Sequence, residues 1–394
     1  MIYPMVVAFK NTLLFWFLLC LFGISNAQDS IKVGADQTKT YLPLLKNKKI
    51  GVVAHASSLI KTPKGLVHLI DTLQASKVNI TKVFAPEHGF RSKADNGENV
   101  ENTIDPITQI PIISLHGKNK KPQVVDLKGI ELMVFDIQDV GVRFYTYLST
   151  LHLVMEACAE NNIPLLILDR PNPNAHYIDG PVLEDEFKSF LGKHNVPIVY
   201  GMTLGEYAQM INNEAWLKNK VRCELSVVPI KNYNHRTPYS LAVRPSPNLP
   251  NDQSINLYPS LCLLEQTPVS IGRGTEMQFQ IFGHPDFKNL DFRFTPFSNF
   301  GAKFPKQEGQ KCYGVDLRKH PKINQIELQW LIGAFSMITD KDSFFFDRFE
   351  FIAGTKSLEN QIKNGLSEKE IKASWKPKIN TFKKIRAKYL LYAD

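Results

Sequence analysis

The chain has 394 residues, of which 43% are hydrophobic and 22% are charged. A chain of this length exceeds one ordinary hydrophobic core, so we expect two lobes with a cleft between them, and the composition excludes a disordered or low-complexity protein. The formal net charge of +9 is spread along the sequence. Because no basic stripe with interleaved aromatic residues is present, nucleic acid is not a predicted partner.

The first 27 residues have the pattern of a signal peptide. Lys10 precedes the apolar run TLLFWFLLCLFGI, and the small residues of SNAQ follow it. This run is shorter than a transmembrane helix, which needs about 20 residues. The sequence therefore predicts cleavage after Ala27, a periplasmic or secreted protein, and no stable membrane insertion. Lipidation at Cys20 is disfavoured because leucines, and not small residues, precede it.

Five short apolar runs rich in Val, Ile and Leu recur in the first half of the chain. They barely alternate between apolar and polar residues, which is typical of strands buried on both faces of a parallel sheet. An amphipathic helix is predicted at 145–162, between the last two runs, and this implies a right-handed crossover. The runs are KIGVVAH (49–55), NITKVFA (79–85), IPIISLH (110–116), IELMVFDI (130–137) and IPLLILD (163–169).

Polar, charged and glycine-bearing segments follow four of these predicted strands. Parallel strands end at the same edge of a sheet, and ligands bind in the crevice at that edge. We therefore expect one site there. The side chains that this topology brings together are Glu87, His88, His116, Asp136, Asp139, Arg143, Asp169, Arg170 and Asn172.

A series of motifs occurs in a fixed order along the chain: APEHGFR, FDIQDVGVRFYTY, LDRPNPN, DGPVLE, YGMTLGEYA, PSPNLP, LYPSLC and SIGRGT. With these motifs the sequence resembles the exo-β-N-acetylmuramidase family, from about Lys49 to Gly283 and more loosely beyond. The resemblance implies an α/β fold, with a Rossmann-like parallel-sheet domain expected at 41–243 and a smaller C-terminal α/β domain expected at 244–394. It also implies an active-site cleft between the domains and release of N-acetylmuramic acid from the non-reducing end of peptidoglycan fragments. No cofactor is implied, and the glutamate of PEHG, Glu87, corresponds to the family's proposed catalytic residue. The sequence departs from the usual pattern at His55, Ala175 and Gln266.

Hydrolysis of a glycosidic bond requires an acid that protonates the leaving oxygen and a second group that activates water or attacks carbon. Glu87 is the candidate acid, because Phe84 and Phe90 would partly desolvate it. The second group is left open among Asp136, Asp139, Asp169 and His88. Carboxyl groups about 5 to 5.5 Å apart would predict retention of the anomeric configuration, and a separation of about 6.5 to 9.5 Å would predict inversion.

Each candidate also has a structural alternative. Glu87 would begin a helix, and the two aspartates of FDIQD would cap one. Asp169 would form an ion pair with Arg170. The tyrosines of FYTY would pack at the start of the predicted helix instead of stacking on a sugar.

The lactyl carboxylate distinguishes N-acetylmuramic acid from N-acetylglucosamine, and an arginine can donate two hydrogen bonds to it. The candidates are Arg91, Arg143, Arg170 and Arg273. Arg273 is favoured because the glycines of GRGT would let the backbone approach the sugar. In PSPNLP, which is expected to connect the lobes, Asn248 is predicted to point into the site. The other predicted binding residues are Tyr145, Asp169, Asn172, Glu265 and Thr275.

Two other classes of function are compatible with the sequence. A metal-dependent hydrolase would use His55, His88 and His116 with the aspartates, but the chain has no HExxH motif or fixed ligand spacing, so we predict no metal site. A non-catalytic muropeptide-binding protein would keep the cleft and its charges without turnover. The four cysteines beyond residue 27 lack CxxC spacing: Cys158, Cys223, Cys262 and Cys312. Two of them, Cys158 and Cys262, lie in apolar segments and are predicted to be small buried apolar residues.

Overall fold

The computed structural model describes residues 30–87, 89–90 and 102–394, and its N-terminal lobe is built on a seven-stranded sheet. The strand order is β5–β6–β4–β1–β7–β8–β9, and only the edge strand β5 runs antiparallel to its neighbour. The parallel strands follow the doubly wound order 3-2-1-4-5-6 of Rossmann folds. The strands are β1 (Lys49–Ala54), β4 (Asn79–Ala85), β5 (Thr103–Ile104), β6 (Pro111–Ser114), β7 (Leu132–Asp136), β8 (Leu165–Leu168) and β9 (Leu225–Val228).

All five predicted strands are confirmed, and burial on both faces explains their unbroken apolar sequences. Val52 of β1 pairs with Val83 of β4 on one face of the sheet, whereas Val53 and Phe84 pair on the other face. All four side chains are fully buried. Since neighbouring residues of a strand point to opposite faces, both faces must be covered by helices.

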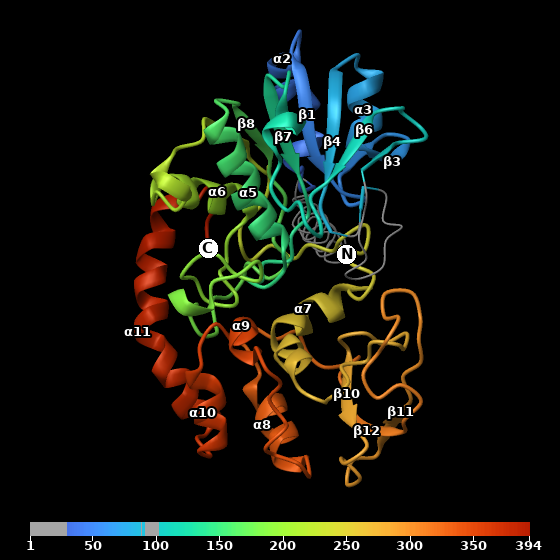
Figure 1. Ribbon diagram of the computed structural model, residues 1–394, viewed down its shortest axis with the longest axis vertical. Coiled ribbons are helices and arrows are strands. Elements are labelled where there is room, and N and C mark those ends of the chain that lie inside the picture. The colour runs from blue at the N-terminus through green and yellow to red at the C-terminus, as the bar shows by residue number, and fades with distance from the viewer. Residues whose placement is uncertain (1–29, 88, 91–101) are drawn as a thin grey trace, which may run out of the picture. The chain divides into compact units, whose positions relative to one another are not determined.

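Helices cover the two faces of the sheet (Figure 1). Helices α2 (Thr38–Leu45) and α3 (Leu69–Ala75) pack on the face of Val52, whereas α5 (Tyr147–Glu160) and α6 (Leu204–Asn213) pack on the face of Val53. Helix α5 confirms the predicted crossover helix. Helix α6 begins at Thr203, whose side chain accepts a hydrogen bond from Glu206 N, as is favoured at a helix start. The lobe also contains the hairpin of β2 (Leu59–Thr62) and β3 (Gly65–His68), helix α4 (Val124–Leu127), and the short 3₁₀ turns η1 (Gly34–Asp36), η2 (Asp185–Phe187) and η3 (Lys218–Lys220).

The smaller C-terminal lobe has its own antiparallel sheet, with the strand order β10–β12–β11. In Figure 1 the helices of this lobe lie to one side of the sheet, and α11 extends up toward the N-terminal lobe. The strands are β10 (Ile281–His284), β11 (Phe292–Phe294) and β12 (Cys312–Asp316). The helices are α7 (Asp252–Leu261), η4 (Cys262–Gln266), α8 (Leu328–Met337), α9 (Phe349–Ala353), α10 (Ser357–Lys363), α11 (Glu368–Arg386) and η5 (Ala387–Tyr389).

The end of the chain returns to the N-terminal lobe. Arg386 donates from Nε and Nη2 to Gly201 O over 2.8 and 2.6 Å. Tyr392 OH donates to Asp169 Oδ2 over 2.7 Å, directly after β8. From Lys32 to Asp394 the chain therefore forms one compact unit, in which the predicted C-terminal domain at 244–394 contributes residues to both lobes.

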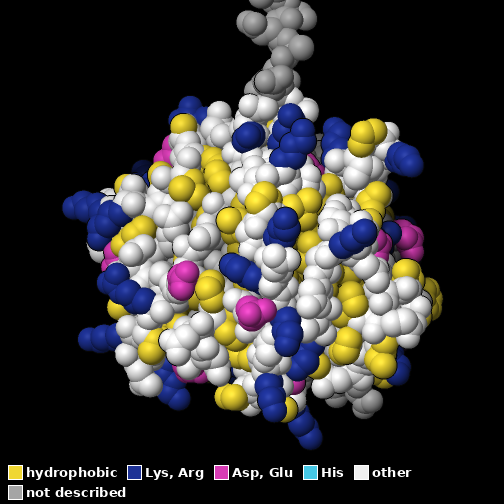
Figure 2. Space-filling view, turned by 90° about the horizontal axis from the view of Figure 1, so that it is seen from above, with side chains coloured by type: hydrophobic (Ala, Val, Ile, Leu, Met, Phe, Trp, Pro, Cys, Tyr) yellow, Lys and Arg dark blue, Asp and Glu magenta, His cyan; other side chains and the backbone are white. Residues whose placement is uncertain are grey.

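Lysine and arginine side chains are dispersed over the face shown in Figure 2, with apolar side chains between them and few acidic ones. This view agrees with the diffuse positive charge of the sequence. Within the described ranges, no helix has the length and apolar character that a membrane crossing would require.

Candidate active site

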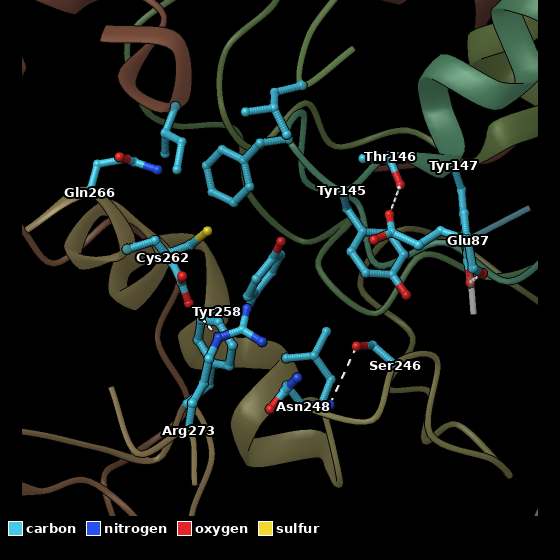
Figure 3. A pocket seen from close by; sticks show the side chains of 16 residues that line it. Glu87, Tyr145, Thr146, Tyr147, Ser246, Asn248, Tyr258, Cys262, Gln266 and Arg273 are labelled. Carbon is cyan, nitrogen blue, oxygen red and sulfur yellow. Dashed lines mark hydrogen bonds and ion pairs between the residues drawn. The ribbon is translucent and has the colours of Figure 1, made fainter. Parts of the chain in front are cut away.

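A pocket of about 270 Å³ lies where the two lobes meet. Residues that follow β4 and β7 form one wall, and residues of the segment 246–249, of α7, of η4 and of the GRGT turn form the other. The pocket is thus at the sheet edge where doubly wound proteins bind ligands. Its volume lies near the lower limit of small-molecule pockets, about 300 to 1,000 Å³, and suits a single sugar residue. The residues with polar groups that line it are Glu87, Tyr145, Thr146, Tyr147, Ser246, Asn248, Tyr258, Cys262, Glu265, Gln266 and Arg273 (Figure 3).

Glu87 lies in a tight turn directly after β4. Gly89 N donates to Pro86 O over 3.1 Å, and Gly89 has a φ of 74°, which favours glycine. Thr146 Oγ1 donates to Glu87 Oε2 over 3.0 Å and so holds the carboxyl group beside the start of α5. Figure 3 shows this group directed into the pocket. Glu87 is therefore part of a turn and does not begin a helix, which was the structural alternative.

The two tyrosines of FYTY connect the start of α5 to the segment that joins the lobes. Tyr145 OH donates to Pro245 O over 2.8 Å, and Tyr147 OH lies 3.4 Å from the same oxygen. Burial raises the pKa of both hydroxyl groups, so both stay protonated donors. The rings meet edge to face with centroids 4.9 Å apart, and the ring of His55 lies behind Tyr147 at 5.5 Å. Both tyrosines pack at the helix start, as predicted, and they also line the pocket.

Arg273 projects into the pocket from a turn that requires glycine on both sides (Figure 3). Gly272 and Gly274 have φ of 81° and 78°, and a Cβ atom on either would lie 2.6 Å from a carbonyl oxygen. Arg273 Nε donates to Glu265 Oε1 over 2.7 Å, whereas its terminal nitrogens donate to no atom of the described residues. The planar guanidinium is therefore fixed at one edge and open at the other.

Lys306 is a second cation whose charge acts on Glu265. Its Nζ donates to Leu264 O over 2.8 Å and to Val269 O over 3.2 Å. Burial lowers the pKa of Lys306 to about 8, which leaves it mostly protonated at neutral pH. Although burial acts to raise the pKa of Glu265, the charges of Arg273 and Lys306 hold it below its usual value. The group of one carboxylate and two cations has a net positive charge.

Asn248 has a side-chain carbonyl oxygen that accepts no hydrogen bond from the described residues. Its Nδ2 donates to Gly301 O over 2.7 Å, and because that oxygen can only accept, the orientation of the amide is fixed. The Oδ1 atom is buried and has no hydrogen-bond donor among the residues that the structure describes. A buried acceptor left unpaired costs about 1 to 3 kcal/mol, so this atom is suited to a ligand N–H or O–H group.

The predicted aspartates after β7 and β8 lie outside the pocket. Asp136 binds Arg170 in a bidentate ion pair, with Oδ1 to Nε at 2.5 Å and Oδ2 to Nη2 at 2.9 Å, and both residues are buried. Arg170 therefore forms an ion pair, as the structural alternative proposed, but its partner is Asp136 and the prediction of Asp169 is wrong. Neither Asp136 nor Asp139 caps a helix, because Thr146 precedes α5.

Asp139 and Asp169 are buried and form no ion pair with any of the described residues. Asp139 Oδ2 accepts hydrogen bonds from Tyr200 OH and Gly141 N, and Asp169 accepts from Thr203 Oγ1 and Tyr392 OH. Burial raises the pKa of each carboxyl group to about 6. Their hydrogen bonds connect loops at the sheet edge, and this arrangement favours a structural role over direct contact with a ligand.

Arg143 is fully buried and joins the two lobes. Nη1 donates to Pro181 O at 2.8 Å and Val196 O at 3.1 Å, whereas Nη2 donates to Ile352 O and Ala353 O, both at 2.8 Å. Its four terminal N–H groups are thus occupied by carbonyl oxygens. This geometry favours a structural role over the predicted contact with substrate.

Two further predicted binding residues are turned inward. Asn172 Nδ2 donates to Met202 O over 2.8 Å, and its Oδ1 accepts from Asn174 N over 2.8 Å. Thr275 Oγ1 donates to Gly272 O over 2.7 Å and so stabilises the turn that carries Arg273. Both residues support the site without lining the pocket.

The predicted residues His88 and Arg91 lie outside the described part of the chain, as do the predicted signal peptide and Cys20. Over residues 30–87, 89–90 and 102–394, no group of three or more His, Cys, Asp or Glu side chains is arranged to hold a metal ion. All four cysteines beyond residue 27 are free and buried, which confirms the prediction for Cys158 and Cys262.

Several pocket residues were missed by reasoning from the sequence, and three of them illustrate why. Thr146 stands between the two predicted tyrosines and binds Glu87. Tyr258 and Cys262 lie four residues apart at the end of α7, a spacing that places side chains on the same face of a helix. Burial raises the pKa of the Cys262 thiol, so it stays protonated and is a poor nucleophile. The i, i+4 spacing within LYPSLC was the signal that could have identified this pair.

Comparisons with known proteins show which family the chain belongs to. The family model described as exo-beta-N-acetylmuramidase NamZ, N-terminal, matches residues 50–253, and the corresponding C-terminal model matches residues 256–392. The peptidoglycan beta-N-acetylmuramidase NamZ of Bacillus subtilis (strain 168) is 35% identical over 376 residues, which is 89% of each chain. Crystal structures of two DUF1343 family proteins from Bacteroides fragilis are also similar. The first has 44% identity and a TM-score of 0.86, and the match covers 93% of this chain and 100% of that protein. The second has 28% identity and a TM-score of 0.79, and the match covers 92% of this chain and 99% of that protein. The chain described here therefore belongs to the exo-β-N-acetylmuramidase NamZ family, a family of glycosidases.

Proposed function

We propose that this protein releases N-acetylmuramic acid from the non-reducing end of peptidoglycan fragments. The observation that carries the proposal is a pocket for one sugar with a carboxyl group on one wall and a guanidinium group on the other, Glu87 and Arg273. An exo-acting enzyme needs a site for one terminal residue, whereas an endo-acting enzyme needs an open groove along the glycan. The family membership and the volume of the pocket both support exo action.

Glu87 is the group proposed to exchange a proton with the glycosidic oxygen. Thr146 fixes Oε2, and Oε1 has no hydrogen-bond partner among the described residues, so it is available to the substrate. A general acid or base must lie within hydrogen-bond reach of the proton that it transfers, and Glu87 is directed into the pocket. Of the carboxyl groups in the described residues, only Glu265 lines the same pocket, and its ion pair with Arg273 suits it to positioning.

Arg273 and Asn248 are proposed to read the two substituents that define the sugar. The open edge of the Arg273 guanidinium suits the lactyl carboxylate, which it would bind with charge-assisted hydrogen bonds. The unpaired Oδ1 of Asn248 suits the N–H group of the acetamido substituent. Both side chains belong to the C-terminal lobe, and so recognition is proposed to come from one lobe and proton transfer from the other.

The proposal is tested by incubating the purified protein with a MurNAc–GlcNAc disaccharide and with 4-nitrophenyl β-N-acetylmuramide. We expect release of N-acetylmuramic acid from both substrates, and NMR of the first product gives the anomeric outcome. Glu87→Gln should keep the fold and lower kcat by about 10² to 10⁴, the usual cost of losing a general acid or base. Binding of the disaccharide without release by the wild-type protein would instead identify a muropeptide-binding protein.

We also propose that the protein acts outside the cytoplasm, in the periplasm or as a secreted protein. The signal-peptide pattern of residues 1–27 supports this location, since its charged start, short apolar run and small residues match a cleavable leader.

A further inference from the structure

A long segment without helices, residues 295–311, connects β11 to β12 and carries three exposed phenylalanines. We call it the aromatic loop. Segments longer than about 12 to 15 residues without regular structure are uncommon in compact domains, and ordered ones usually have a function. Phe297, Phe300 and Phe304 have exposed fractions of 60%, 56% and 84%. Contiguous exposed apolar surface marks sites of interaction, and these three side chains all lie in one loop.

The aromatic loop is held by hydrogen bonds in which these three rings take no part. Gly309 N donates to Pro296 O over 2.9 Å, Asn299 and Ala302 form an isolated β-bridge, and Ser298 N donates to Glu308 Oε1 over 3.1 Å. The phenylalanines are therefore available to a partner without loss of the hydrogen bonds that fix the loop.

The same backbone attaches the loop to the rim of the pocket. Phe297 N donates to Gly274 O over 2.9 Å, next to Arg273. Gly301 O accepts the hydrogen bond from Asn248 Nδ2 over 2.7 Å. Gly301 has a φ of 95°, and a Cβ atom on it would lie 2.8 Å from Pro247 Cβ. The loop thus packs closely on both segments that carry the proposed sugar-reading residues, and in Figure 1 it extends from the β11–β12 sheet toward the N-terminal lobe.

We propose that the aromatic loop binds the part of the substrate on the reducing side of the scissile bond, namely the N-acetylglucosamine leaving group and the residues that follow it. This inference rests on the proposed function. A pocket that holds one terminal sugar leaves the rest of the glycan at its rim, and the loop is continuous with that rim. The apolar faces of pyranose rings pack on aromatic rings, which bury a large apolar area.

The chemistry of the loop fits a glycan better than an apolar peptide. Phenylalanine has no polar group, so it would recognise the face of a sugar ring and tolerate the substituents at its edge. Lys303 is exposed, with Nζ 5.6 Å from the ring centroid of Phe304. This cation suits the carboxylate of the next muramoyl residue along an alternating glycan.

The test compares two substrates that differ only in what leaves. The first is N-acetylmuramyl β-fluoride, whose leaving group is a single atom. The second is a tetrasaccharide of alternating MurNAc and GlcNAc with MurNAc at the non-reducing end. The proteins are the wild type, the triple variant Phe297→Ser/Phe300→Ser/Phe304→Ser, and the single variant Phe304→Ser. A matched control, Val124→Ser/Val125→Ser, removes two apolar side chains that are each 72% exposed and do not line the pocket.

The measured quantity is the ratio of kcat/KM on the tetrasaccharide to kcat/KM on the fluoride. We expect the triple variant to lower this ratio about tenfold, mainly through KM, and the control to leave it within about twofold. If the triple variant has a reduced melting temperature, the test rests on the ratio measured for Phe304→Ser. This single change should leave the fold intact, because a side chain that is 84% exposed contributes little to stability.

An active wild type whose ratio is the same in all variants would overturn this inference and leave the proposed function intact. A wild type that releases no N-acetylmuramic acid from either substrate would overturn both. A wild-type dimer that the triple variant dissociates, with an unchanged ratio, would identify the loop as a contact between two copies of the chain and would likewise refute the glycan site.

Discussion

Replacement of Arg273 by alanine should abolish the preference for muramides over glucosaminides. The two sugars differ by the lactyl ether, and its carboxylate is the group that the open edge of Arg273 is proposed to bind. In the wild type, Nε is occupied by Glu265 at 2.7 Å, so the two terminal nitrogens supply the contact. Arg273→Ala removes these donors and leaves Glu265 in the pocket wall without its direct partner.

The magnitude has two parts. A hydrogen bond to a charged group contributes about 1.5 to 3 kcal/mol, which is a factor of about 10 to 150 in kcat/KM. In addition, the remaining Glu265 carboxylate repels the lactyl carboxylate, and only Lys306 stays nearby to offset it. We therefore expect a loss in the upper half of that range for the muramide. The glucosaminide has no carboxylate, and its kcat/KM should change by less than about threefold, since it loses no charged contact.

The assay is kcat/KM on paired 4-nitrophenyl muramide and glucosaminide substrates for four proteins. Glu265→Gln is the matched control, because it keeps Arg273 and should keep the preference for the muramide. Arg273→Ala/Glu265→Gln should recover part of the loss, since the repulsive carboxylate is gone. An equal decrease on both substrates in Arg273→Ala would show that the residue is architectural, and the reasoning from the open guanidinium edge would be refuted.

Three other predictions concern stability and export. Arg143→Met should lower the free energy of unfolding by about 3 kcal/mol or more, because several buried carbonyl oxygens lose their donors. Urea denaturation measures this change, and a decrease below about 1 kcal/mol would contradict the interlobe role. His152 and His194 form a buried pair with ring nitrogens 3.0 Å apart, and burial lowers the pKa of both, that of His152 to about 4. Because the unfolded chain binds more protons below its histidine pKa of about 6.5, stability should fall as the pH falls from about 6.5 to 4, and His152→Gln should flatten the dependence of the urea midpoint on pH over that range. Asp139 and Asp169 act in the opposite sense, since their raised pKa values favour the folded state at low pH. If His152→Gln leaves the dependence of the urea midpoint on pH unchanged, the histidine pair is excluded as its cause. N-terminal sequencing of the exported protein should begin at Gln28, and a retained Met1 or a lipid on Cys20 would contradict the leader.

The sequence identified the sheet and one wall of the site because these follow from local rules. Unbroken apolar runs predict strands buried on both faces, and parallel strands must end at a common edge. Glu87 follows β4 directly, so its position near that edge depends only on the strand and the turn after it. Arg273 was identified for a similar reason, since the flanking glycines of its turn are visible in the sequence and permit a backbone that other residues would not adopt. Strand β5 was missed because its two residues are too few to show a pattern, and β9 was missed because it is a partly exposed edge strand without an unbroken apolar run.

Tertiary structure decided which polar residues at the sheet edge face the pocket. The loops after β7 and β8 contain acids, arginines and an asparagine in similar settings, and no local pattern separates those that bind each other from those that meet a ligand. Arg170 binds Asp136 and not its neighbour Asp169, and Arg143 binds carbonyl oxygens of residues 352 and 353, far along the chain. A buried polar group must find a partner, and that partner is chosen by three-dimensional packing. Sequence therefore locates the edge where chemistry is possible, whereas packing determines which side chains remain unpaired and available to a substrate.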